Sequence, residues 1–275
     1  MPVNAGIRSE LINLVPYGLV VTRGWLMEKG LKRHSIDNLV KSEQLLPLCQ
    51  GVYKRPETKL KWQGVVCSVQ RMGSDLTLGG LSALALHGYA HYLSLSQQKT
   101  VHLYGADKLP SWANKLIEDV KFVRHSDTRL LGHGLYVHHD FDGKKGTTKN
   151  LDPLLGFTTE MPGVDESWPL TVSSPERALF EVLSDVPERV SFEHADQLMQ
   201  GLSTLSPRRL EKLLARTGNV KVKRLFFWFA DRHRHAWCKK LDSNDFDLGK
   251  GKRMLTKGGK LDKKYQITVP EEMYG

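Results

Sequence analysis

Three clusters of histidine, cysteine and aspartate are the first candidates for chemistry in this chain, because these side chains bind transition metals. The clusters are His87 with His91, His138 and His139 with Asp140 and Asp142, and His233 with His235 and Cys238. None of them supplies four ligands at a spacing typical of a zinc site. We therefore predict no metal site and expect hydrogen-bonded or exposed histidines.

A second candidate is the run Gly249-Lys250-Gly251-Lys252-Arg253. Glycines let the backbone approach an anion and lysines neutralise it, so the run could hold a phosphate group. It lacks the strand–loop–helix frame of a nucleotide-binding loop, and the alternative is a basic β-hairpin whose glycines only form turns. The sequence contains no GxSxG, HExxH, GxxxxGK[ST], HRD or DFG motif. We predict no catalytic residue, no cofactor and a function other than catalysis.

The distribution of charge is more informative than these motifs. Residues 208–264 contain 18 Lys and Arg against 6 Asp and Glu, and residues 1–62 contain 10 against 5. Residues 63–207 contain 12 against 17, and the whole chain has a formal net charge of +10. Two basic ends that flank an acidic middle indicate two separate surfaces for polyanions or acidic partners.

Length and composition limit the class of protein. A chain of 275 residues with 40% hydrophobic residues is long enough for two domains, each with a core. It has no apolar run of about 18 residues and no signal-peptide pattern at its start, so we expect a cytoplasmic protein without a membrane partner. Three widely spaced cysteines predict free thiols in a reducing compartment.

The first 62 residues have the pattern of a winged helix-turn-helix domain. Apolar residues at helical spacing over Ile7–Val15 predict a first helix. Thr22 can cap a short helix over Arg23–Lys29, and Ser35 can cap a third helix from Ile36 to about Leu45. Residues Leu46–Lys54 predict a strand, a turn and a strand. Helix, short helix, helix and hairpin is the element order of a winged helix-turn-helix domain. In such domains the third helix lies in the major groove of DNA.

The polar face of the third predicted helix carries the candidate DNA contacts. Ile36, Leu39 and Val40 form its apolar side, so the polar residues lie opposite. We expect Asn38 to bond an adenine edge, and the basic hairpin to contact phosphate. Asp37 lies on the same polar side, where it would repel phosphate, accept from cytosine or brace a basic neighbour. The alternative is a small helical domain with a solvated polar face. The full set of predicted DNA-binding residues is Arg33, His34, Ser35, Asn38, Lys41, Tyr53, Lys54 and Arg55.

Residues 63–275 alternate predicted strands and helices, so the expected fold class is α+β, with a larger mixed α/β domain after the winged helix. Two subdomains, 63–205 and 206–275, are an option within it. Ser174 followed by Pro175, and Ser206 followed by Pro207, each predict the start of a helix. We also expect helices over 78–86, 112–120 and 221–237, and a final strand over 265–269. The basic face predicted here consists of Lys221, Lys223, Arg224, Lys250, Lys252, Arg253 and Lys257.

Taken together, these segments resemble the AbiEi-type antitoxins of bacterial type IV toxin–antitoxin systems, which act in abortive infection against phage. The resemblance depends on five segments in the family's order, namely residues 51–54, 78–88, 173–179, 219–225 and the closing run DLGKGKR…KGGKLDKKYQITVP. It implies an N-terminal domain that binds inverted repeats in the operon's own promoter and represses it. It also implies a C-terminal antitoxin domain that neutralises a cognate AbiEii-like nucleotidyltransferase toxin.

Two other functions remain open at this point. One is a stand-alone winged-helix transcriptional regulator with a ligand-sensing C-terminal domain, whose mark would be an apolar pocket with a few convergent polar groups. The other is a kinase-like antitoxin that modifies its toxin. Inverted repeats require two copies on DNA, so both a monomer that pairs on DNA and a stable dimer fit the sequence.

Overall fold

The N-terminal part consists of a short strand, two short helices and a hairpin, which bury their apolar residues in a common core. The computed structural model describes residues 11, 14–56, 58–89, 98–131, 158–161 and 169–274. The elements here are β1 (Val20–Thr22), α2 (Arg23–Glu28), α3 (Arg33–Lys41), β2 (Leu46–Cys49) and β3 (Val52–Lys54). The three strands pair antiparallel in the order β1-β3-β2. The predicted cap of α2 is confirmed, since the Thr22 hydroxyl accepts from the Trp25 amide at 3.2 Å.

The bounds predicted for the third helix are wrong. α3 begins one turn earlier, at Arg33, because Lys32 is the extended residue that precedes it, and Ser35 lies inside the helix and does not cap it. The helix ends at Lys41, and Glu43 then takes a left-handed conformation with φ of 56°. Most of the first predicted helix lies outside the described residues. Leu11 and Leu14 are helical, and the Val15 amide donates to the Leu11 carbonyl at 2.8 Å.

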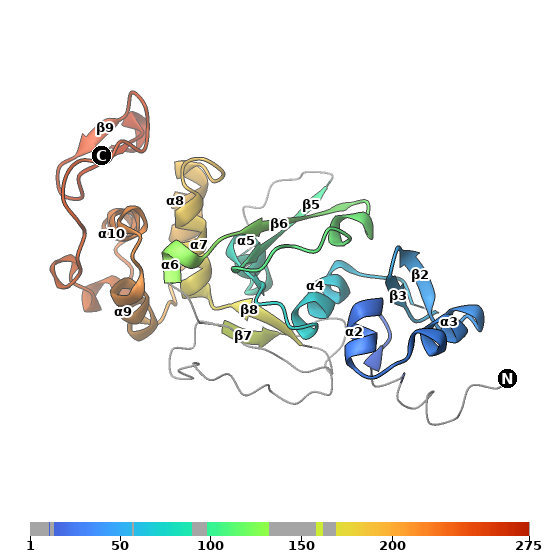
Figure 1. Ribbon diagram of the computed structural model, residues 1–275. Helices are drawn as coiled ribbons and strands as arrows, with labels where there is room; N and C mark the ends of the chain where they lie inside the picture. Colours follow the sequence, from blue (N-terminus) through green and yellow to red (C-terminus); the bar gives the residue numbers. More distant parts are fainter. Residues whose placement is uncertain are drawn as a thin grey trace.

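The middle of the chain forms a mixed five-stranded sheet in the order β6-β5-β4-β8-β7. Its strands are β4 (Thr77–Leu78), β5 (Lys99–Tyr104), β6 (Val120–His125), β7 (Thr158–Met161) and β8 (Leu170–Ser173). β5 with β6 and β4 with β8 are parallel, whereas β4 with β5 and β7 with β8 are antiparallel. Four helices accompany the sheet (Figure 1), namely α4 (Trp62–Arg71), α5 (Gly80–Leu86), α6 (Thr128–Leu131) and α7 (Pro175–Asp185). This mixture confirms the α+β class.

Two predicted helices of the middle region differ from the structure. The helix expected over 112–120 is only a single 3-10 turn, η1 (Ala113–Lys115). The helix expected over 78–86 begins only at Gly80, because Leu78 belongs to β4. The sequence also suggests a strand over 135–138 followed by a loop over 140–150, and both lie outside the described residues. The helix after Ser174 is confirmed, since Pro175 is its first residue and the Ser174 hydroxyl accepts from the Arg177 amide at 3.4 Å.

The C-terminal part packs helices around aromatic side chains. Its elements are α8 (Phe192–Gly201), α9 (Pro207–Arg216), α10 (Val220–His233), η2 (Ala236–Lys240), η3 (Ser243–Asp245), β9 (Lys260–Asp262), β10 (Ile267–Val269) and η4 (Glu271–Met273). Phe226 of α10 stacks on Trp237 of η2 with ring centroids 5.7 Å apart. The helix expected over 221–237 stops at His233 because Arg234 takes a left-handed conformation with φ of 50°.

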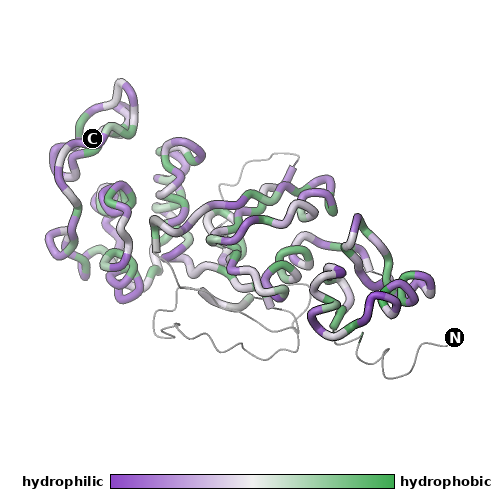
Figure 2. Tube along the Cα trace, in the orientation of Figure 1, coloured by the Kyte–Doolittle hydropathy of each residue, from purple (hydrophilic) through white to green (hydrophobic). Residues whose placement is uncertain are grey.

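Helix α4 connects the N-terminal sheet with the central sheet. The Ser68 hydroxyl accepts from the Val20 amide of β1 at 2.8 Å. On another side of the helix, the Gln70 amide group exchanges two hydrogen bonds with the backbone of Thr171 in β8, at 2.8 and 3.0 Å. One apolar core runs through all three parts of the described chain, from Leu11 to Met273. Figure 2 shows the hydropathy of each residue along the chain, and α3 and the C-terminal loops are largely hydrophilic.

Candidate nucleic-acid and partner interfaces

Helix α3 presents a polar, basic face to solvent. Ile36 and Leu39 are buried, whereas His34, Asn38 and Lys41 are exposed. The exposed three are spaced by four and three residues, so they lie on one side of the helix. Arg33 is also exposed, and Ser35 is half-buried. The structure therefore brings together four of the eight predicted DNA-contacting residues on one accessible surface.

Arg23 fixes how α3 lies against the neighbouring elements. Its guanidinium donates to the Asp37 carboxylate at 2.8 Å and to the Tyr53 hydroxyl at 2.9 Å. Hydrogen bonds to Tyr53 and then to Asp37 raise the pKa of Arg23. Asp37 therefore braces a basic neighbour, which is one of the three roles open from the sequence. Sequence reasoning missed Arg23, although its position just after the Thr22 cap is a signal that could have found it.

The hairpin residues are more enclosed than the sequence suggested. Tyr53 is only 4% exposed, because its ring lies in the core and its hydroxyl accepts a hydrogen bond from Arg23. Its inclusion among the direct DNA contacts is therefore wrong. The Lys54 ammonium donates to the Thr58 carbonyl. Arg55 lies over the Tyr17 ring at 3.9 Å and donates to its hydroxyl at 2.9 Å. Lys54 and Arg55 are half-buried, so both basic residues are held in place beside the hairpin.

Three of the seven residues predicted for the C-terminal basic face point inward. Arg224 is 2% exposed and donates to four backbone carbonyls at 2.7 to 3.1 Å, those of Leu248, Gly249, Gly251 and Gln266. This fork of donors holds the Gly-rich run against α10. The run therefore directs carbonyl oxygens toward a buried cation, the opposite of the amide cradle that a phosphate would need.

Lys221 and Lys223 are also removed from the exposed face. The Lys221 ammonium donates to the carbonyls of Ser184 and Val186, each at 2.7 Å, and burial lowers its pKa. Lys223 is only 7% exposed. Sequence reasoning placed these residues on the surface because it counted charge along α10, and a charge count does not report which side of a helix is covered.

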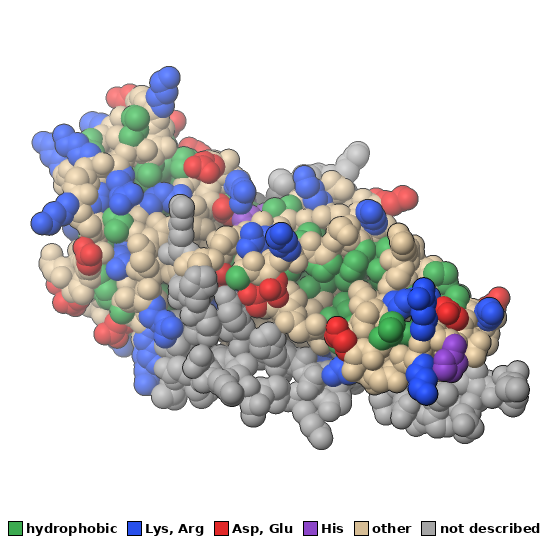
Figure 3. Space-filling view, in the orientation of Figure 1, with side chains coloured by type: hydrophobic (Ala, Val, Ile, Leu, Met, Phe, Trp, Pro, Cys, Tyr) green, Lys and Arg blue, Asp and Glu red, His purple; other side chains and the backbone are tan. Residues whose placement is uncertain are grey.

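The other four predicted residues form an exposed basic loop, which we define as residues 250–257. Lys250, Lys252, Arg253 and Lys257 are all exposed, and Met254 between them is 76% exposed. The loop is anchored by backbone hydrogen bonds, from the Arg253 amide to the Gln266 carbonyl and from the Thr268 amide to the Arg253 carbonyl. Figure 3 shows Lys and Arg side chains gathered over the C-terminal end of the molecule. Sequence reasoning overlooked Met254, whose signal is an apolar residue within a basic, Gly-rich run.

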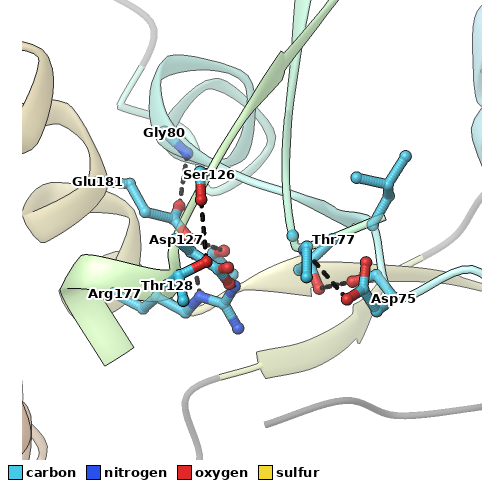
Figure 4. A network of polar contacts seen from close by, with 12 residues as sticks. Asp75, Thr77, Gly80, Ser126, Asp127, Thr128, Arg177 and Glu181 are labelled. Carbon is cyan, nitrogen blue, oxygen red and sulfur yellow. Dashed lines mark hydrogen bonds and ion pairs between the residues drawn. The ribbon is translucent and has the colours of Figure 1, made fainter. Parts of the chain in front are cut away.

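A buried ionic network joins two of the segments that support the family resemblance (Figure 4). Arg177, 1% exposed, donates to Glu181 at 2.7 Å and to Asp127 at 3.1 Å. Glu181 also accepts from the Gly80 amide at 2.7 Å and from the Ser173 hydroxyl at 2.9 Å. Burial raises the pKa of Glu181 and of Asp127, and the charge of Arg177 opposes both shifts. The network fastens α7 to α5 and β8.

The described histidines of the three sequence clusters form hydrogen bonds to other residues instead of facing a common metal position. Nε2 of His87 lies 2.9 Å from the Ser173 carbonyl, and Nε2 of His235 lies 2.8 Å from the Met199 carbonyl. Nε2 of His233 lies 2.8 Å from the Asp196 carboxylate. Within the described ranges, no group of three His, Cys, Asp or Glu is placed to hold a metal ion. His91 and the cluster of residues 138–142 lie outside those ranges.

Two further findings concern membrane-spanning helices and the cysteines. In the part of the chain that the structure describes, no helix has the length and apolar character needed to cross a bilayer. The three cysteines are free thiols, as expected, and Cys67 is the buried one, while Cys49 and Cys238 are half-buried.

Comparison with known proteins identifies the family. Residues 98–270 match the family described as transcriptional regulator, AbiEi antitoxin, type IV TA system, and residues 7–95 match its N-terminal domain. These matches cover nearly all of the chain and place the protein among transcriptional regulators. The chain belongs to the AbiEi antitoxin family of type IV toxin–antitoxin systems, as its sequence motifs suggested.

The N-terminal match ends at residue 95 and the other begins at residue 98, so the two meet between α5 and β5. The sequence predicted an earlier boundary, at residue 62. No curated protein matches the sequence. Among solved structures, the fold is similar to that of the RV2827C protein from Mycobacterium tuberculosis, with a TM-score of 0.51 and 17% identity. The similarity covers 95% of this chain and 89% of that one, and it concerns the fold alone.

Proposed function

We propose that this protein represses its own operon by binding inverted repeats in the promoter through α3 and the β2–β3 hairpin. We further propose that it neutralises a cognate AbiEii-like nucleotidyltransferase toxin through the exposed basic loop, residues 250–257. The two activities use opposite ends of the molecule, since the N-terminal elements and the C-terminal loops lie at its two ends (Figure 1).

One observation carries the DNA-binding proposal: the exposed polar face of α3, with Asn38 between His34 and Lys41, on a helix held by the Arg23–Asp37 pair. An asparagine amide matches the adenine edge in the major groove, and basic side chains beside it meet phosphates. Helix, short helix, helix and hairpin in this order support a winged helix-turn-helix domain, the arrangement that places such a face in the groove. Inverted repeats then take two copies, as a stable dimer or as monomers that pair on DNA.

Asn38→Ala and Lys41→Ala separate base reading from phosphate binding. We expect Asn38→Ala to cost about 1–3 kcal/mol on promoter DNA and little on random DNA, because it removes a base contact. Lys41→Ala should weaken both equally and lower the salt slope by about 1. Fluorescence anisotropy of the full chain over a salt series measures both effects. Lys61→Ala, an exposed lysine outside α3, serves as the charge-matched control. Equal losses on both DNAs for Asn38→Ala would exclude a base contact.

The neutralising surface is supported by the exposed charge of the loop and by Met254 within it. An exposed methionine with a basic rim has the composition of a binding patch, an apolar anchor among charges that select an acidic partner. A nucleotidyltransferase-like toxin would offer acidic groups of a metal site to such a loop. Lys223 and Arg224 have no part in this surface because they are buried.

A triple charge reversal tests the loop. We expect Lys250→Glu, Lys252→Glu and Arg253→Glu together to abolish rescue of growth when the full-length variant is co-expressed with the neighbouring toxin gene. Promoter affinity should stay unchanged, because α3 is untouched. The control is Lys239→Glu with Lys240→Glu, two exposed lysines of the C-terminal part outside the loop. Full rescue by the triple variant would show that neutralisation uses another surface.

A further inference from the structure

A cavity of about 490 Å³ lies between strand β5 and helices α5, α7 and α8. Pockets of a few hundred Å³ with mostly apolar walls and a few polar groups are typical of small-molecule sites. This cavity is far in the chain from the α3 face and from the exposed basic loop. It shares none of its lining residues with either surface. It therefore needs an explanation of its own.

One side of the cavity is apolar. Leu81 and Ala85 are four residues apart on α5, so they share a helix face, and Leu86 and the indole of Trp62 join them. All four side chains are only half-buried, although each is apolar. Partly exposed apolar side chains around one hollow leave a surface that gains free energy when an apolar group fills it.

The polar end of the cavity is already satisfied by its own hydrogen bonds. The Asp185 carboxylate accepts from the Tyr104 hydroxyl at 3.1 Å and lies 3.1 Å from Nδ1 of His125. Arg189 lies 2.9 Å from the same His125 nitrogen and 3.5 Å from Asp185. Burial would raise the pKa of Asp185, but the hydrogen bonds from His125 and Tyr104 and the charge of Arg189 outweigh it, so its pKa is lowered. Asp185, the acidic residue among the described residues that line the cavity, is therefore ionised and already paired.

His102 adds no charge to this end. Its Nδ1 lies 2.9 Å from Nε2 of His125. Burial, followed by the neighbouring His125, lowers the pKa of His102 to about 4, so the ring is neutral at pH 7. With Asp185 paired to Arg189, the remaining charge among the lining residues is that of Lys99.

Two lining groups can still bind a ligand, Lys99 and His194. The exposed Lys99 ammonium lies over the Trp62 ring at 4.7 Å, and among the described residues no acidic side chain forms an ion pair with it. Nε2 of His194 is a buried atom without a hydrogen-bond partner in the described structure, and burial lowers the pKa of this ring. A neutral imidazole can carry its proton on Nε2 and donate it to an oxygen. Buried polar atoms in native proteins normally have a partner, so this one requires an explanation.

We propose that this cavity binds a small organic carboxylate with an apolar body of bicyclic aromatic size. The apolar body packs on Leu81, Ala85 and Trp62. The carboxylate meets the ammonium of Lys99 beside the Trp62 ring. Nε2 of His194 can donate a hydrogen bond to a polar atom of the bound molecule. A carboxylate gains from the lysine charge, whereas a cation would face the excess positive charge of the lining. This site is independent of the proposed DNA and toxin surfaces.

Isothermal titration calorimetry of the full chain with 2-naphthoate and with uncharged 2-naphthamide tests the site. We expect 2-naphthoate to bind with a Kd on the order of 1 mM or tighter, and the amide at least about tenfold more weakly. Lys99→Gln should lower the affinity for 2-naphthoate about tenfold and leave that for 2-naphthamide unchanged, since it removes only the charge. Equal binding of the two probes, or no binding of 2-naphthoate, would overturn the proposal.

Two further variants locate the binding. Ala85→Phe fills the cavity and should abolish 2-naphthoate binding while the thermal melting curve stays cooperative. Lys121→Gln is the matched control, an exposed lysine on the adjacent strand β6, beside Thr100 of β5 in register. It should leave the affinity unchanged. An unchanged affinity for 2-naphthoate in Lys99→Gln, or an equal loss of affinity in Lys121→Gln, would show that the anion binds elsewhere.

Discussion

At the scale of single residues, Arg224 shows how a basic side chain can serve the fold alone. Arg224→Lys keeps the charge but replaces a planar fork of donors by a single ammonium, so several of the four carbonyls lose their partner. We expect the free energy of unfolding to fall by about 2–4 kcal/mol, because buried acceptors without partners are costly. Urea denaturation monitored by circular dichroism measures this change.

The control for this change is Lys252→Gln, which alters an exposed charge in the same segment. Substitutions at such sites usually stay within about 0.5 kcal/mol. If Arg224→Lys is equally mild, the four bonds to the Gly-rich run do not stabilise the fold. Toxin neutralisation should be tested only with variants of the exposed loop, since a change at Arg224 would confuse loss of fold with loss of binding.

The residues also show what the sequence could predict of the site. The exposed face of α3 follows from helical periodicity, because Ile36 and Leu39 define the buried side and thereby the accessible one. Tyr53, Lys223 and Arg224 could not be placed in this way. Their burial depends on segments distant in the sequence, such as Arg23 for Tyr53 and residues 248–251 for Arg224. Periodicity describes one element and carries no information about its neighbours.

At the scale of elements, the start of α5 depends on a glycine that no other residue can replace without strain. Gly80 has a φ of +50°, and a Cβ there would lie 2.6 Å from the Tyr104 hydroxyl. Tyr104 is buried and bonded to Asp185, so it cannot move away freely. We expect Gly80→Ala to lower the free energy of unfolding by about 2–4 kcal/mol, from backbone strain and overpacking together.

Gly201→Ala provides the comparison for this element. Gly201 is the last residue of α8, and a Cβ there would meet nothing within 4 Å. The alanine should therefore be neutral or stabilise the protein by up to about 1 kcal/mol. Thermal melts of both variants distinguish strain at one site from a general effect of glycine replacement. Similar melting temperatures for the two variants would contradict the role assigned to Gly80.

Element boundaries were predictable where a local cap determines them and uncertain where it does not. Thr22 and Ser174 accept the hydrogen bonds expected of caps, so α2 and α7 begin at the predicted residues. Ser35 has the right chemistry but lies inside α3, because the chain turns helical directly after Lys32. Both α3 and α10 end before the predicted residue, at Lys41 and His233. The left-handed residues that follow, Glu43 and Arg234, are not glycines and carry no sequence signal.

At the scale of the whole molecule, the sheet order β6-β5-β4-β8-β7 brings β4 beside β8, across more than ninety residues of chain. Strands and helices were predictable separately, but this pairing was not. It depends on the Arg177–Glu181 network and on Gln70 of α4, whose partners are distant in the sequence. A different long-range contact, from the Val20 amide to the Ser68 hydroxyl, holds α4 against β1, so a boundary at residue 62 would separate two elements that are bonded to each other.

Because α4 packs on both sheets, we expect the described core to unfold as one unit. Incorporation of 5-fluorotryptophan gives each tryptophan its own ¹⁹F signal, so Trp25 of α2 and Trp237 of η2 report on the two ends in one urea titration. Their midpoints should coincide. Ser68→Ala leaves the buried Val20 amide without its partner, which costs about 1–3 kcal/mol, and should move both midpoints together. If the Trp25 signal alone moves, the N-terminal part is an independent folding unit, and repressor and antitoxin would be separable as fragments.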